Sequence, residues 1–105
     1  MAGMKHGVIT LTGATQRLST LLGATDVVRA ITLQPGGANA NPIYVGGPAV
    51  DGTTFGVRLE AAVATVPPAP WQLSELFGWG HLSLEDVYVR GTNTEKLHVL
   101  WLPQV

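Results

Sequence analysis

The chain has 105 residues and no cysteine, so it has the length of one domain, spanning 1–105, without disulfides or thiolate metal ligands. Charged residues make up 12% of it, about half of the roughly 25% typical of a soluble domain. Its net charge is −1, its six Lys and Arg residues are spread along the chain, and no apolar run reaches the about 20 residues that cross a bilayer. Because phosphate binding requires a basic cluster, we expect no direct nucleic-acid partner. Because no apolar run is long enough to cross a bilayer, we expect no membrane partner either.

Glycine and proline divide the chain into short segments rich in Val, Ile, Thr and Leu, which are typical of β-strands. Three strands are expected in the first third of the chain, at Met4 to Leu11, at about Gln16 to Leu22 and at Val27 to Gln34. In the third, regular alternation places Val27, Ile31 and Leu33 on one face and Val28 on the other. Pro35 and the glycines after it end this strand.

The middle of the chain predicts a loop, a short strand and one contested segment. The loop Asn39 to Gly47 carries a strand at Ile43 to Val45. From Val57 to Val66, apolar residues alternate as in a half-buried strand, although a helix would also gather an apolar face there. We prefer the strand, because its neighbours are strands and Pro67 ends the segment. The prolines up to Pro70 predict a stiff connection into Trp71.

The last third predicts a corner followed by a long strand. Leu82 and Leu84 differ in parity from Val87 and Val89, so a bulge or corner is expected near Glu85 and Asp86. After a polar turn, Lys96 to Leu102 forms a strand that is apolar on both faces, and both faces are therefore expected to be buried. Together these elements predict an all-β domain, a small β-sandwich or barrel of about 7–8 short antiparallel strands.

No residues with the spacing of a catalytic or metal site stand out. The histidines, His6, His81 and His98, lie in different segments without a ligand spacing, and no serine has a nucleophile-elbow context. Adjacent Glu85 and Asp86 on a strand would point to opposite faces. We therefore predict no catalytic, cofactor or metal site and no enzyme, although the sequence alone leaves open a site assembled from distant residues.

The low charge favours a surface that other protein covers, because a free small domain usually coats itself with charged side chains. The alternative is a monomer coated with Thr, Gln and Asn. Trp101 is expected in the core, whereas Trp71 and Trp79 lie in or beside irregular connections, where tryptophan often anchors an interface. The candidate interface residues are Tyr44, Trp71, Trp79, His98, Leu100 and Leu102.

Several segments carry a resemblance to a known class of proteins. They are Gln16-Arg17-Leu18-Ser19, Val28 to Leu33, Asn41 to Gly47, Leu84 to Thr92 and Leu97 to Trp101. In these segments the chain resembles small structural proteins of tailed-bacteriophage virions, especially capsid decoration or cement proteins. It departs from their pattern where Leu59 to Ala62 replaces a glycine-containing turn and where Pro67 to Trp71 looks like an insertion.

The resemblance implies a virion protein on the capsid surface, without a cofactor. Such a protein forms a compact β-sandwich or barrel, oligomerises, often as a trimer, and clamps neighbouring subunits of the major capsid protein. The alternative is a carbohydrate- or receptor-binding module of a phage fibre or tail. That alternative rests on Tyr44, Trp71 and Trp79, which lie near predicted loops.

Overall fold

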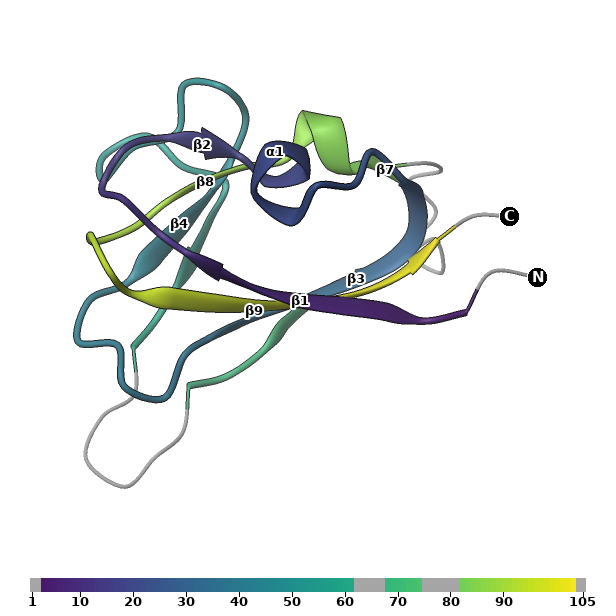
Figure 1. Cartoon of the computed structure of the whole chain (residues 1–105). Helices are drawn as coiled ribbons and strands as arrows, with labels where there is room; N and C mark the ends of the chain where they lie inside the picture. Colours follow the sequence, from purple (N-terminus) through teal and green to yellow (C-terminus); the bar gives the residue numbers. More distant parts are fainter. Residues whose placement is uncertain (1–2, 62–67, 75–81, 104–105) are drawn as a thin grey trace.

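The computed structural model describes residues 3–61, 68–74 and 82–103. Figure 1 shows two antiparallel β-sheets stacked as a sandwich, with one short helix beside them. The described residues form nine strands, five in one sheet and four in the other. The prediction of an all-β domain is therefore confirmed.

The five-stranded sheet combines both ends of the described chain with its middle. Its strand order is β1 (Lys5–Thr10), β9 (Lys96–Pro103), β3 (Val27–Pro35) and β6 (Trp71–Ser74), and β7 (Leu82–Ser83) pairs with the start of β3. The first, third and last predicted strands correspond to β1, β3 and β9. Strand β9 is thus central, with β1 on one side and β3 on the other.

The four-stranded sheet has the order β2 (Gln16–Arg17), β8 (Tyr88–Arg90), β4 (Ile43–Gly46) and β5 (Val57–Leu59). Strand β4 confirms the short strand predicted inside the loop. Strand β5 covers only the start of the contested segment, and residues 62–67 lie outside the described residues.

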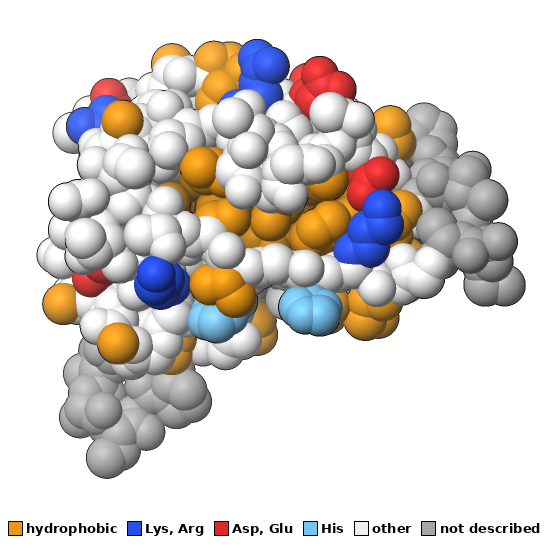
Figure 2. Space-filling view, in the orientation of Figure 1, with side chains coloured by type: hydrophobic (Ala, Val, Ile, Leu, Met, Phe, Trp, Pro, Cys, Tyr) orange, Lys and Arg blue, Asp and Glu red, His pale blue; other side chains and the backbone are white. Residues whose placement is uncertain are grey.

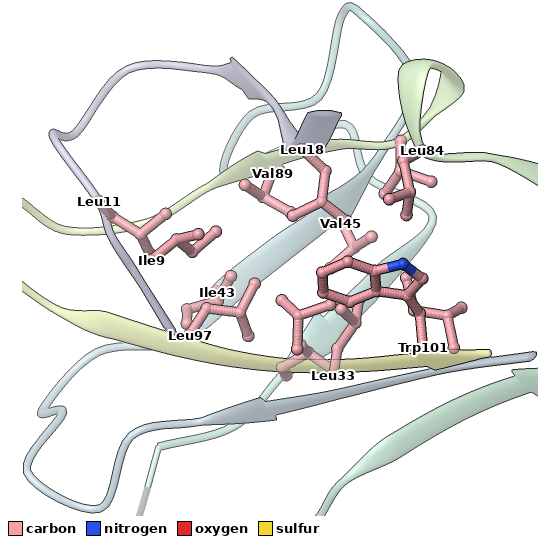
Figure 3. Packing of buried hydrophobic residues seen from close by; sticks show 14 of the residues in the cluster. Ile9, Leu11, Leu18, Leu33, Ile43, Val45, Leu84, Val89, Leu97 and Trp101 are labelled. Atoms are coloured by element: carbon pink, nitrogen blue, oxygen red, sulfur yellow. The ribbon is translucent and has the colours of Figure 1, made fainter. Parts of the chain in front are cut away.

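The core lies between the two sheets and takes side chains from both. Figure 3 shows Val45 and Val89 of the four-stranded sheet facing Leu33 and Trp101 of the five-stranded sheet. Leu33 and Val89 are fully buried, and Trp101 is 5% exposed, as predicted for a core tryptophan. Burial of such side chains, at about 1.5–3 kcal/mol each, is the main force holding the sheets together.

The strand predicted at Gln16 to Leu22 is wrong after its second residue. Residues Leu18–Leu22 form the helix α1, which ends at Gly23 with φ of 67°. A strand would point the adjacent Leu21 and Leu22 to opposite faces, whereas both are half-buried and packed against the core here. One turn of helix therefore buries both leucines, and Gly23 supplies the left-handed residue that ends the turn.

Strand β3 departs from regular alternation at a bulge. Its register against β9 shifts between Val28 and Ala30. The extra residue brings Val28 to the core face with Ile31 and Leu33, and leaves Val27 39% exposed. The predicted grouping of Val27 with Ile31 and Leu33 is therefore wrong.

The predicted corner is confirmed as the 3-10 turn η2 (Leu84–Asp86) between β7 and β8. The Ser83 side chain accepts a hydrogen bond from the backbone N–H of Glu85 at the start of this turn. The turn changes the parity of the chain, so Leu84, Val87 and Val89 are all buried.

Candidate interaction surface

The outer face of the five-stranded sheet, which points away from the core, carries mostly uncharged side chains. Strand pairing aligns its side chains in rows, one of which runs from His6 through Leu100 and Thr32 to Gln72. We define the outer face by nine residues: His6, Val8, Ala30, Thr32, Gln34, Gln72, His98, Leu100 and Leu102. None of the nine is Lys, Arg, Asp or Glu, and the exposed Lys96, on the same side of β9, borders the face at its end.

Large apolar side chains on this face are open to solvent. Val8 is 56% exposed and Leu100 38% exposed, and Met4, just before β1, is 67% exposed. Two open hollows, of about 180 and 260 Å³, lie on the face and share Thr32 and Leu100. Figure 2 shows histidine side chains beside hydrophobic ones along the lower edge of the molecule, where this sheet lies in Figure 1.

One carboxylate accepts hydrogen bonds from two of the strands that supply the outer face. Oδ2 of Asp26, just before β3, accepts hydrogen bonds from Trp101 Nε1 of β9 at 2.9 Å and from Lys5 Nζ of β1 at 3.1 Å. The bond from Trp101, followed by that from Lys5, lowers the pKa of Asp26. Because hydrogen bonds to the charged form favour it, Asp26 remains ionised where these strands meet.

The opposite side of the sandwich has a different chemistry. Strand pairing aligns Arg90, Tyr44 and Arg58 in one row of the four-stranded sheet and places Arg17 beside Tyr88 in another. We call these five residues the charged face. They include three of the six Lys and Arg residues, which their separation in the sequence did not reveal.

The cations of the charged face have partners within the chain. Arg58 Nε lies 2.7 Å from Glu60 Oε1, and Arg17 Nε donates to the Tyr88 hydroxyl at 2.9 Å. Arg90 contributes to the lowered pKa of Asp51, although the main cause there is the hydrogen bond from the backbone N–H of a neighbouring threonine. The charged face is therefore balanced by nearby acids and does not form a continuous basic field.

An aromatic pair borders the charged face. The rings of Tyr44 and Phe55 are 5.0 Å apart between centroids, and Phe55 is 43% exposed. Asp51 orders the loop before Phe55, since its Oδ1 accepts from the backbone N–H groups of Thr53 and Thr54 at 2.8 and 2.7 Å. This turn places the phenyl ring against Tyr44.

The structure brings together three of the six candidate interface residues. His98, Leu100 and Leu102 lie on one side of β9, on the outer face. Tyr44 lies on the opposite side of the molecule. Trp71 is on β6 rather than in an irregular connection, and it packs partly against the core. Trp79 lies outside the described residues.

Six of the nine outer-face residues were not among the candidates, including His6 and Val8 of β1. The sequence signal was the alternation along β1, where His6, Val8 and Thr10 share one parity while Ile9 is buried. That signal fixes a face but not a neighbouring strand, so it did not reveal that His6 and His98 line one hollow. The expectation that both sides of β9 are buried is not met in the single chain, where Leu100 is exposed.

A separate cleft of about 210 Å³ opens between the sheets. Trp71, Leu33 and Val57 contribute to its lining, and Asp86 is the one charged residue among its described lining residues. Ligand pockets are typically about 300–1,000 Å³ and contain a few convergent polar groups. This smaller apolar cleft lacks such groups, so we assign it no ligand.

Within 3–61, 68–74 and 82–103, no three His, Cys, Asp or Glu side chains are arranged to hold a metal ion. In the same ranges no helix has the length and apolar character to cross a membrane. Comparisons with protein-family models, curated proteins and solved structures find no match to this chain.

Proposed function

We propose that this chain is a virion structural protein, a capsid decoration protein that oligomerises and binds neighbouring subunits of the major capsid protein. In this role it acts on the capsid surface, without a cofactor and without catalysis, and the expected oligomer is a trimer. The observation that carries the proposal is the uncharged outer face of the five-stranded sheet.

The outer face supports this function through its composition. The centres of protein interfaces are depleted in charged residues, whereas a free surface is usually rich in them. Leu100 on the inner strand β9 and Val8 on the edge strand β1 are exposed on a face that only Lys96 borders with a charge, in a chain that contains only 12% charged residues. The resemblance of the strand and turn segments to decoration proteins directs the proposal to a virion.

The direct test is binding of the purified protein to capsids assembled from the major capsid protein of the phage that encodes it. We expect the protein to sediment with the capsids and to raise the temperature at which they disassemble. The control uses capsids of an unrelated phage, which should not bind it. Absence of binding to the cognate capsids would refute the decoration role.

A second candidate is a carbohydrate- or receptor-binding module of a phage fibre or tail, which the Tyr44–Phe55 pair favours. Exposed aromatic rings can stack against sugars, and Phe55 is 43% exposed beside Tyr44. Trp71 suits this role less well, because it packs partly against the core. Replacement of Phe55 with Ala should then abolish binding on a glycan array while the domain stays folded, and unchanged binding would count against this function.

A further inference from the structure

We infer that the outer face of the five-stranded sheet is the surface through which this chain binds a second copy of itself. The inference rests on the oligomeric part of the proposed function. A face that contacts its own copy forms a closed two-fold dimer, so this inference predicts a dimer in place of the trimer that the resemblance implies. It names the occupant of the face, a second copy, and three residues that contact it: His98 and Leu100 on the inner strand β9, and Val8 on the edge strand β1.

The first argument is charge complementarity. When a surface contacts a copy of itself, a charged side chain can be brought against its own copy, and like charges in contact oppose association. The nine residues of the outer face include no Lys, Arg, Asp or Glu. Lys96, at the edge of the face, extends toward Thr10 and donates to its hydroxyl at 2.7 Å. Two copies of this face can therefore meet without repulsion at the centre.

The charged face does not meet this requirement. Arg17, Arg58 and Arg90 lie on one side of the four-stranded sheet, among acids such as Glu60. Desolvation of these ions in a contact between copies is costly, because the free energy of hydration that each ion loses can exceed the gain from its partner. The two sides of the sandwich thus differ, and self-association is assigned to the uncharged side.

The second argument is area. Four strands about 4.8 Å apart and a central strand of eight residues, at about 3.3 Å per residue, give the outer face a projected area of about 500 Å². Two such faces supply about 1,000 Å², which is the lower bound for a specific interface, and the relief of the side chains adds to it. Interfaces at this low end of the size range are typical of weak or transient association.

The test measures the native mass of four proteins by light scattering and sedimentation from about 1 µM to 1 mM. They are the wild type, the outer-face variants Leu100→Lys and Val8→Lys, and the control Phe55→Lys on the opposite side. Val8, Leu100 and Phe55 are all exposed hydrophobic residues, at 56%, 38% and 43%. Each lysine therefore replaces a side chain that is partly exposed to solvent in the single chain. Thermal unfolding checks that the variants remain folded.

We expect the wild type and Phe55→Lys to form an oligomer above the monomer mass of 11.0 kDa. Each outer-face variant should dissociate, with an association constant at least about tenfold lower, because its lysines are brought against one another. A wild type that is monomeric throughout the range overturns the inference. So does an outer-face variant that associates as the wild type does.

Capsid sedimentation of the same proteins separates this inference from the proposed function. Oligomers that dissociate in the outer-face variants, combined with no wild-type binding to cognate capsids, would support the inference while the decoration role fails. A monomeric wild type whose capsid binding is lost in Leu100→Lys would instead identify the capsid as the occupant of the face. That outcome would refute the inference that a second copy covers the outer face, whereas the decoration role would be supported.

Discussion

Trp101 donates a hydrogen bond from its indole Nε1 to Oδ2 of Asp26 at 2.9 Å. Lys5 Nζ lies 3.1 Å from the same oxygen, so one carboxylate connects β9 and β1 to the residue that precedes β3. These three strands supply most of the outer face. This charged group at the border of the core therefore adds to the backbone pairing that aligns the strands of the candidate surface.

Replacing Asp26 with Asn should lower the free energy of unfolding by about 1 kcal/mol at pH 7, because the partly exposed ion bonds to Trp101 and Lys5 are weakened. The pKa of Asp26 is lowered in the folded state. Its stabilisation is therefore complete above the pKa of the unfolded chain and is lost as the pH falls through the folded pKa.

Urea unfolding at pH 7 and at about pH 2.5 checks this prediction, since the difference between wild type and Asp26→Asn should shrink in acid. The matched control is Glu60→Gln, which removes an exposed ion pair with Arg58 and should change stability little. A difference between wild type and Asp26→Asn that stays the same in acid would show that the ionised carboxylate is not its source.

Substitutions on the two sides of β9 should lower the free energy of unfolding by different amounts. Leu97 is fully buried, so Leu97→Ala should cost about 2–5 kcal/mol of unfolding free energy. Leu100→Ala on the same strand should cost less than about 1 kcal/mol in the monomer, because the side chain is 38% exposed. Denaturant titration at low protein concentration compares the two variants, and equal losses would contradict the observed orientation of the strand.

Gly91, after β8, should not tolerate a side chain. A Cβ there would contact Leu11 Cδ1 too closely and lie 3.3 Å from Ile43 Cγ1, and both neighbours are fully buried. Gly91→Ala should therefore destabilise the fold by about 1–3 kcal/mol through overpacking. Thermal unfolding measures the loss, with Gly37→Ala as the control, since a Cβ at Gly37 meets nothing within 4 Å. Similar behaviour of the two variants would contradict the packing of Leu11.

Local patterns were sufficient to predict several elements of the fold. Alternation of apolar residues identified β1, β3 and β9, and the parity change between Leu84 and Val87 identified the corner. Local patterns failed where packing with distant residues decides the backbone. The adjacent Leu21 and Leu22 reach the core through a helical turn, and the bulge in β3 exists only in relation to β9.

The candidate surface was predictable only in part. The sequence of β9 alone indicates His98, Leu100 and Leu102, because they share one parity along a strand that is apolar on both sides. The rest of the surface comes from β3, β6 and β1, and the pairing of β1 with β9 joins residues about 90 positions apart in the chain. Alternation says which residues share a face, but the choice of neighbouring strand depends on the whole fold. The same limit hid the convergence of the arginines on the charged face.

The central position of β9 also constrains the order in which the chain can fold. Strand β1 pairs only with β9 among the described strands, and β3 shares its longest pairing with β9 as well. During synthesis, β1 leaves the ribosome long before the strand that shields Ile9 from water. Closure of the five-stranded sheet must therefore await β9, which makes folding slow relative to domains built from local contacts.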